Sequence, residues 1–240
     1  MAINAQVLNG WDDVAAFLST MKDTRGNNYF SNVVYDSTAN TLSLYTTESG
    51  ANPFAVFDTS SIRFNAHYDN AGADASYSIQ YLNSSSVNFP INGYKARHGC
   101  ILALKNVTSA TDLSYAFPIA FCKTHEGYTA LLHSAGQPLS ANSARNAYIH
   151  TYTSDYYARI SQTGAALGFK IDPPSSNLTM IVPNADFTTM IELPVFTSQA
   201  PDYTENAYFL LTRQSYGVFG SFTYSGHVYL TNGRVAILDT

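Results

Sequence analysis

The stretch Ile62-Arg63-Phe64-Asn65-Ala66-His67-Tyr68 alternates apolar or aromatic residues with polar ones, and this alternation decides the fold class. The same period of two recurs in Ser76-Tyr77-Ser78-Ile79-Gln80-Tyr81. Successive side chains of a β-strand point to opposite faces of a sheet, so a period of two predicts strands with one buried face.

Strand patterns of this kind continue along the chain on both sides of these two stretches. Further strands are predicted at 29–36, 41–47, 99–107, 115–124, 127–133, 147–153, 165–171, 178–182, 189–196 and 207–213. A parallel α/β architecture needs helical patterns between its strands, and none occurs after residue 26. The sequence therefore predicts an all-β fold, an antiparallel sandwich or jelly roll, with one short N-terminal amphipathic helix.

That helix is predicted over residues 10–24. Asn9 is placed to cap it by accepting from the amide of Asp12, and Gly26 is available to end it. Its apolar stripe has helical spacing and consists of Trp11, Val14, Ala15, Phe17, Leu18 and Met21. We favour a helix that covers its own sheet, and the alternative is a helix that docks on a neighbouring subunit.

The chain is expected to consist of two segments. Residues 1–26 form an N-terminal helical segment that packs on, or docks from, an antiparallel β domain of residues 27–240. The Ser-, Ala- and Asn-rich residues 134–145, and residues 172–176, are interpreted as loops within one unit. A subdivision of the β domain near 134–145 is the alternative.

The C-terminal end predicts a three-stranded meander. Asn232-Gly233 favours a two-residue type I′ turn, which pairs Leu230 with Val235 and Val228 with Ile237 on one buried face. The opposite face then holds Tyr229, Thr231, Arg234 and Ala236. Upstream, Ser225-Gly226 is expected to turn residues 217–224 back against residues 227–230.

Composition excludes several classes of function. Of the 240 residues, 45% are hydrophobic but only 12% are charged, against about 25% in ordinary proteins. The net charge of −5 argues against nucleic acid as the main ligand, and 14% aromatic residues argue against disorder. No apolar run approaches a membrane span of about 18 residues, and the N-terminus has no basic secretory region. We expect a protein without a membrane partner, made in a cytoplasm.

Two cysteines and two histidines form the one candidate metal set. His98-x-Cys100 and Cys122-x-x-His125 supply zinc-type ligands, but both cysteines lie in predicted strands rather than on tight turns. Buried free thiols are the favoured interpretation, with zinc and a disulfide as alternatives. We expect no metal and no cofactor.

No local motif predicts catalysis. The only glutamates, Glu48, Glu126, Glu192 and Glu205, stand in no acid/base motif, and no nucleophile elbow or phosphate-binding loop occurs. A site assembled from distant strands stays open, but we expect a protein that is not an enzyme.

Two local clusters are candidate contact sites for a partner subunit or a glycan. The first is an aromatic and polar cluster of Tyr148, Tyr152, Asp155, Tyr156, Tyr157 and Arg159, whose tyrosines suit stacking on a sugar ring or, as the alternative, simply fill a strand. The second is the basic segment 94–98, where Lys95 and Arg97 lie in an expected solvated loop.

A short capped helix, strands rich in Asn, Ser, Thr and Tyr, and an end at Tyr229-Leu230-Thr231-Asn232-Gly233-Arg234-Val235-Ala236-Ile237-Leu238-Asp239 together resemble small virion structural proteins of tailed bacteriophages. The resemblance implies an all-β subunit, assembled in the bacterial host cytoplasm into the capsid, neck or tail. The implied partners are copies of itself and other virion proteins, and no catalytic residue is carried over. A carbohydrate- or receptor-binding β-sandwich module is the alternative function.

Overall fold

The computed structural model describes residues 5–68, 76–83, 85–106, 116–134, 147–151, 158–163, 168–172, 180–183, 189–196, 201–211, 220–231 and 235–240. Within these ranges one helix lies near the N-terminus and all named strand pairs are antiparallel. The predicted all-β antiparallel fold with one short N-terminal helix is therefore confirmed.

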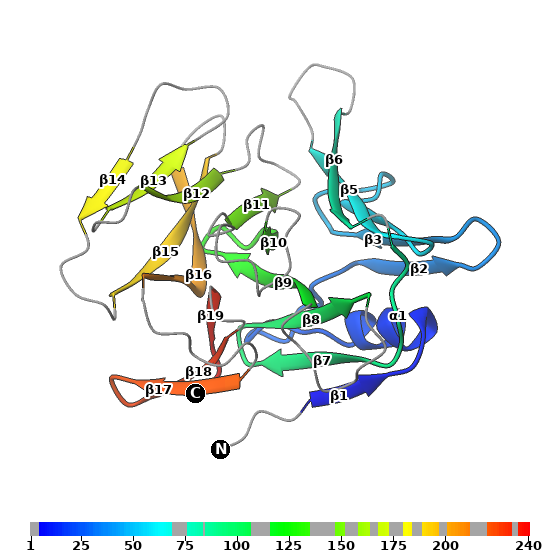
Figure 1. Cartoon of the computed structure of the whole chain (residues 1–240), viewed down its shortest axis with the longest axis horizontal. Helices are drawn as coiled ribbons and strands as arrows, with labels where there is room; N and C mark the ends of the chain where they lie inside the picture. The colour runs from blue at the N-terminus through cyan, green and yellow to red at the C-terminus, as the bar shows by residue number, and fades with distance from the viewer. Residues whose placement is uncertain are drawn as a thin grey trace.

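The elements follow one another along the chain as shown in Figure 1. The first half contains β1 (Ala5–Leu8), α1 (Trp11–Ser19), β2 (Asn32–Asp36), β3 (Thr41–Tyr45), β4 (Ala55–Asp58), β5 (Ile62–Tyr68), β6 (Ser76–Asn83), β7 (Ile91–Ala96), β8 (Gly99–Lys105) and β9 (Ala116–Thr124). The second half contains β10 (Thr129–Ser134), β11 (Ala147–Thr151), β12 (Ala158–Thr163), β13 (Gly168–Asp172), β14 (Met180–Pro183), β15 (Thr189–Phe196), β16 (Pro201–Leu211), β17 (Gly220–Tyr224), β18 (His227–Thr231) and β19 (Val235–Leu238).

The described strands form two sheets, one large and branched, the other small. The small sheet has five strands in the order β2-β3-β4-β5-β6. The large sheet has 14 strands, with a main path β14-β13-β12-β11-β10-β9-β16-β19-β18-β17. It branches at β9, which pairs with β8 along Ala116–Cys122 and with β16 at Lys123 and Thr124. Beyond β8 the branch continues through β7 to β1 (Figure 1).

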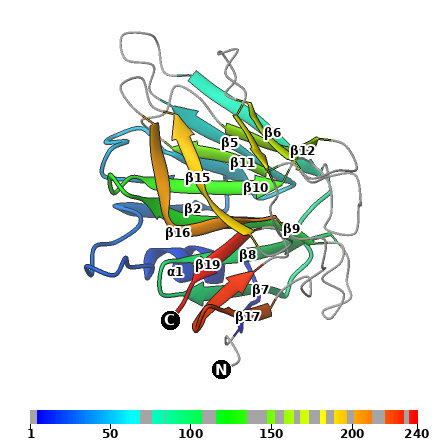
Figure 2. The same ribbon diagram turned by 90° about the vertical axis from the view of Figure 1, so that its left-hand side faces the viewer.

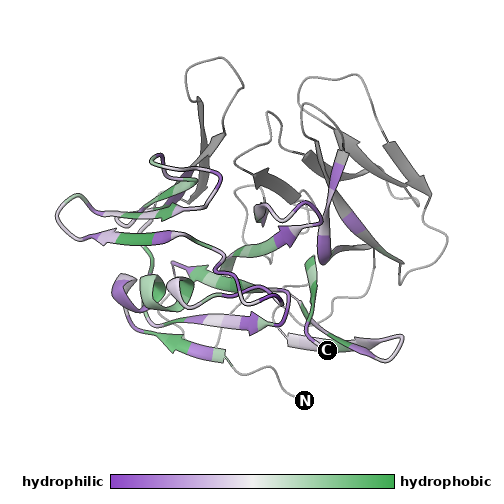
Figure 3. Ribbon diagram, turned by 180° about the vertical axis from the view of Figure 1, so that it is seen from behind, coloured by the Kyte–Doolittle hydropathy of each residue, from purple (hydrophilic) through white to green (hydrophobic). Residues whose placement is uncertain are grey.

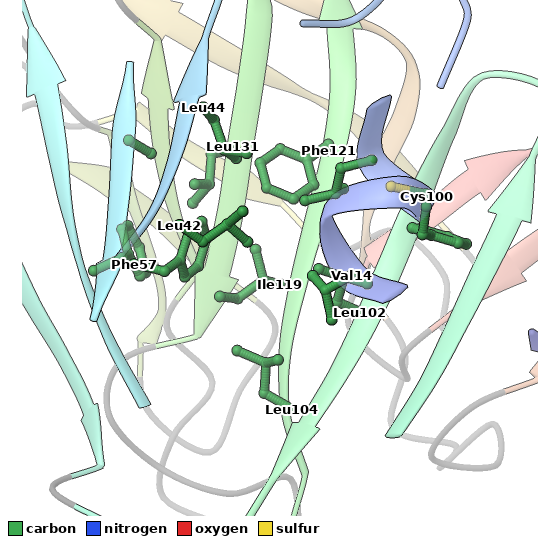
Figure 4. Close-up of a cluster of buried hydrophobic side chains, with 14 of the residues drawn as sticks. Val14, Leu42, Leu44, Phe57, Cys100, Leu102, Leu104, Ile119, Phe121 and Leu131 are labelled. Atoms are coloured by element: carbon green, nitrogen blue, oxygen red, sulfur yellow. The ribbon is translucent and has the colours of Figure 1, made fainter. Parts of the chain in front are cut away.

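The five-stranded sheet packs face to face on the large sheet and forms the main core. Leu42, Leu44 and Phe57 of the small sheet face Ile119 and Leu131 of the large one (Figure 4). The buried face of α1 extends this core over Leu102 and Phe121. Each of these side chains is nearly inaccessible to solvent. The large apolar area removed from water by this packing is the main stabilising contribution to the fold.

Helix α1 is shorter than predicted. It covers Trp11–Ser19 instead of residues 10–24, and its N-cap is Gly10, which has no side chain to donate or accept. The predicted cap is reversed, because the Asp13 carboxylate accepts from the backbone N–H of Asn9 at 2.7 Å. The hydroxyls of Ser19 and Thr20 donate to backbone carbonyls of the last turn. Such hydroxyls compete with continued helix, which explains the early end.

The apolar face of α1 is buried within its own chain, as the favoured interpretation has it. Gly93 of β7 makes room for the helix, since a Cβ there would lie 2.8 Å from the Phe17 ring. Trp11 donates its indole N–H to the carbonyl of Thr59, 3.1 Å away in the β4–β5 turn. The helix thus connects the edge branch of the large sheet with the small sheet.

The C-terminal meander is confirmed, but its last register is wrong. Ser225 and Gly226 form the predicted turn between β17 and β18, and their φ angles of 49° and 83° are both positive, as in a type I′ turn. Beyond β18, however, Thr231 pairs with Ala236 and Leu230 with Ile237, two positions further along than predicted. Asn232, Gly233 and Arg234 lie outside the described residues. A two-residue turn is excluded by the observed pairs.

Where β18 pairs with β19, both faces of the meander are buried, whereas one solvent-facing side was predicted. Tyr229, Thr231 and Ala236 are at most 5% exposed. The Tyr229 ring stacks on Phe222 at a centroid distance of 5.4 Å and meets Tyr208 of β16 edge-on at 5.9 Å. The prediction failed because β16 pairs with β19 and brings additional aromatic side chains onto this face.

Four strands were not predicted from the sequence: β1, β4, β7 and β12. The segment 94–98, predicted as a solvated loop, is instead the end of β7 followed by a tight turn into β8. Residues 135–146 and 173–179, which hold most of the two predicted loops, lie outside the described residues. Across the described part of the chain, no helix has the length and apolar character needed to span a bilayer.

Candidate functional site

The predicted aromatic cluster is only partly within the described residues. Tyr148 in β11 and Arg159 in β12 are directly opposite each other in the sheet register. Tyr152, Asp155, Tyr156 and Tyr157 lie outside the described part of the chain. The structure therefore brings together one pair of this cluster along the backbone of two adjacent strands.

Lys95 and Arg97 do not join that pair, because β8, β9 and β10 separate β7 from β11. The Lys95 ammonium donates to Thr20 Oγ1 at 2.8 Å and lies 4.7 Å from the centroid of the Phe17 ring. The backbone N–H of Arg97 donates to the carboxylate of Asp239 at 3.0 Å. Lys95 thus links the end of α1 to β7. The two predicted clusters are separate in space.

The two cysteines are buried free thiols on opposite faces of neighbouring strands. Cys100 pairs with Phe121, whereas Cys122 pairs with Gly99, so the register offsets the two thiols by one residue. Burial raises the pKa of Cys100 to about 12 and raises that of Cys122 as well. Opposite faces prevent a disulfide between them and prevent both from holding one metal ion.

The two histidines of the metal hypothesis also lie apart, each with its own neighbour. The His98 ring is 3.1 Å from the side-chain amide of Asn206, and burial lowers its pKa. The His125 ring is 3.1 Å from the Glu192 carboxylate. Among the described residues, no three His, Cys, Asp or Glu side chains converge into a set that could hold a metal ion.

The described acidic residues nearest to His125 form an electrostatic contact between β9 and the β15–β16 pair. The hydrogen bond to Glu192 raises the pKa of His125, burial opposes this, and the charges of Glu192, Glu205 and Asp202 raise it further. The backbone N–H of His125 also donates to the carbonyl of Tyr203 at 2.9 Å. This arrangement joins three strands and stabilises the branch point of the large sheet.

Two strands at ends of the large sheet, β1 and β17, leave one edge unpaired among the described strands, and of these β1 was not predicted from the sequence. β1 pairs only with β7, and β17 only with β18, among the described strands. Neither strand contains a charged residue, a proline or a bulge. Val7 on β1 is 55% exposed and Tyr224 on β17 is 36% exposed. Both strands lie at the same end of the molecule (Figures 1 and 2).

An unpaired strand edge presents a row of backbone donors and acceptors to any strand that approaches it. Soluble monomers commonly block such edges with Lys, Pro or bulges. The adjacent apolar residues Val7 and Leu8 are the only signal for β1 in the sequence, and a segment of four residues without alternation cannot be distinguished from a loop. The structure makes β1 and β17 the candidate functional surfaces, which we name the assembly edges.

The sequence matches no protein-family model, and comparisons with curated proteins and with solved structures give no match.

Proposed function

We propose that this chain is a non-enzymatic structural subunit of a tailed-bacteriophage virion, working in many copies in the capsid, neck or tail. The observation that carries the proposal is the pair of uncharged, unblocked assembly edges at β1 and β17. In an assembly these edges pair with strands of other subunits, so their backbone groups are satisfied and protected from aggregation.

The assembly edges are short, which is consistent with weak contacts between subunits that are repeated many times in one particle. β1 has four residues and β17 has five, so one such pairing supplies only a few hydrogen bonds. Each bond stabilises an association by about 1 kcal/mol, and many copies held in one particle convert weak contacts into a stable one. A surface poor in charge also favours assembly, because burying uncharged amides and hydroxyls in an interface costs less free energy than burying ions.

The virion setting is supported by the resemblance of the helix, the polar and Tyr-rich strands and residues 229–239 to small virion proteins. The proposal places assembly in the bacterial host cytoplasm, with copies of this chain and other virion proteins as partners. It includes no metal, cofactor, nucleic-acid or membrane partner. The alternative, a carbohydrate- or receptor-binding module, predicts a dispersed protein with glycan affinity.

The proposal is tested by placing charge on the assembly edges. Light scattering after size exclusion, over a range of concentrations, is expected to show the unaltered chain as oligomers. Val7→Lys and Thr223→Lys should shift these to monomers without lowering the melting temperature, because lysine blocks strand pairing. Thr38→Lys adds the same charge on an exposed turn away from both edges and should leave the oligomers intact.

A second measurement concerns the source particle. Mass spectrometry of purified virions should detect this chain in many copies. A chain that stays monomeric at every concentration, is absent from the particles and turns over a substrate would overturn the proposal.

A further inference from the structure

The five-stranded sheet carries a polar hollow on the face turned away from the core. Its cavity volume is about 320 Å³, and its polar lining comes from Asn40, Thr41, Asp58, Ser60, Arg63 and Asn65. Small-molecule sites in proteins span about 300–1,000 Å³, so the hollow is of a size for one small ligand. We use the name polar hollow for these six residues.

Sheet register explains why these side chains gather. Thr41 pairs with Asp58, and Asp58 pairs with Arg63, so three neighbouring strands align them in one row. Asn65 lies in the next row, two residues beyond Arg63 on the same face of β5. The intervening residues, such as Phe57 and Phe64, point into the core and are at most 2% exposed. The hollow therefore rests on a well-packed sheet.

An ion pair fixes one wall of the polar hollow. Arg63 Nη2 lies 2.5 Å from Asp58 Oδ2, and the backbone N–H of Ser60 donates to Asp58 Oδ1 at 2.9 Å. Burial alone raises the pKa of Asp58, but the hydrogen bonds from Ser60 and the charge of Arg63 outweigh it and lower that pKa. At neutral pH the wall thus carries a carboxylate and a guanidinium whose charges cancel.

The rest of the lining offers polar side chains that are not engaged in hydrogen bonds. Within the described part of the chain, the side chains of Asn40, Thr41 and Asn65 make no hydrogen bond to protein. Asn40 is held in place by its backbone, with φ of 54° and its carbonyl accepting from Thr59 at 2.9 Å. Two amides and one hydroxyl therefore face the hollow as both donors and acceptors.

The chemistry of this lining selects among ligand classes. An anion is disfavoured because Asp58 neutralises Arg63, and a cation is disfavoured because both Asp58 oxygens are already engaged. An apolar ligand would leave the amides unsatisfied. Vicinal hydroxyls of a sugar both donate and accept, which matches amides beside a fixed carboxylate and guanidinium.

We propose that the polar hollow binds one ring of a neutral saccharide. This site is distinct from the assembly edges, and the inference does not depend on the proposed structural role. A ligand of this size, held mostly by hydrogen bonds, is expected to bind with a dissociation constant of about a millimolar.

The test uses nuclear magnetic resonance titration of the full chain with D-glucose, D-galactose, N-acetyl-D-glucosamine and L-rhamnose. At least one sugar should shift the backbone amides of residues 39–41 and 56–65 in a saturable way. Asn65→Ala should weaken that binding at least about fivefold, the effect of one lost hydrogen bond. Ser43→Ala, on the same face of β3 but outside the hollow, should leave the affinity unchanged.

Three results would overturn the inference. The first is the absence of saturable shifts at these amides with all four sugars. The second is equal affinity of the unaltered chain and Asn65→Ala. The third is a stronger response of the same amides to sodium sulfate, which would identify a site for anions at Arg63. Melting temperatures of both variants serve as the control for folding.

Discussion

Strands β8 and β3 illustrate two different ways in which this chain forms a sheet. All seven residues of β8 are buried, whereas β3 alternates between buried and half-buried positions. β8 is covered on one face by α1 and the five-stranded sheet, and it reaches Ile237 of β19 near Gly99 on the other. β3 is covered on one face only. A continuous apolar run thus corresponds to burial on two faces, and alternation to burial on one.

The strands that stabilise the fold are therefore not the strands that offer a surface to partners. The centre of the large sheet, β8 to β10, holds the chain together and offers no exposed face for binding. The small sheet keeps a polar outer face, because half-buried polar residues alternate with buried apolar ones along β3. Figure 3 colours the ribbon by the hydropathy of each residue. The assembly edges at β1 and β17 are a third kind of surface, made of backbone groups.

The largest expected effect on stability is the difference between substitutions of two adjacent β5 residues whose side chains lie on opposite faces of the sheet. Phe64 is fully buried and contacts Phe57 and His133 by its ring, whereas Asn65 lies on the outer face. Phe64→Ala is expected to lower the free energy of unfolding by about 3–5 kcal/mol, and Asn65→Ala by less than about 0.5 kcal/mol. Urea denaturation measures both. Equal losses would contradict burial of the small sheet on one face only.

The second effect concerns the branch point at the centre of the large sheet. A Cβ at Gly99 would lie 2.3 Å from the carbonyl oxygen of Phe121 and 3.2 Å from Ile237. Because backbone has to move to relieve this contact, Gly99→Ala should cost about 2–3 kcal/mol. Gly220→Ala is the control, since a Cβ there meets nothing within 4 Å. Similar melting temperatures for the two variants would show that β8 and β9 are not this close.

A third, smaller effect tests the helix that covers the centre. Asp13 accepts from Asn9 through both the backbone and the side-chain amide, whereas Asp12 in the same turn makes no side-chain hydrogen bond in the described structure. Asp13→Ala should therefore cost about 1 kcal/mol more than Asp12→Ala, although both remove a negative charge near the helix N-terminus. Thermal unfolding gives the comparison, and identical melting temperatures would argue against the Asn9 contact.

The smallest effect is a pH dependence at the contact between β9 and β15. Since the pKa of His125 is raised in the folded state, its stabilising effect is complete below the unfolded value of about 6.5. It is lost as the pH rises through the raised folded value. His125→Gln should therefore be less stable than the unaltered chain at about pH 5.5 and equal to it at about pH 9.

The expected loss is below about 1 kcal/mol, because His125 is half exposed to solvent. Comparison with the variant isolates His125 from His98, whose lowered pKa gives a pH dependence of the opposite sign. Glu192→Gln should remove most of the same dependence. A constant difference across the whole pH range would contradict the ion pair.

The sequence by itself determined the features that depend on neighbouring residues. Alternation in residues 62–68 specified which face of β5 is buried, because apolar side chains favour the core and polar side chains favour contact with water. Ser225-Gly226 specified the position of the turn between β17 and β18, because a tight turn depends on the φ angles of its own two residues. The burial of Cys100 and Cys122 was likewise predicted, because cysteine is among the residue types most often buried.

Only the tertiary structure decided which strands become neighbours and which faces are covered a second time. The β18–β19 register is displaced by two residues from the predicted one, and the displacement leaves every side chain on its expected face. Local alternation cannot distinguish these registers. Packing of Tyr229 between Phe222 and Tyr208 involves three strands, and such contacts have no signature within any one of them.

The candidate surfaces could not be predicted from the sequence for the same reason, because they too depend on contacts between strands. The polar hollow depends on the alignment of Thr41, Asp58 and Arg63 across three strands, and the assembly edges depend on which strands lie at the ends of the large sheet. Pairing between strands is a long-range contact whose free energy includes the packing of the whole core. Residue patterns determine the faces of each strand, and the tertiary structure determines the order in which the strands meet.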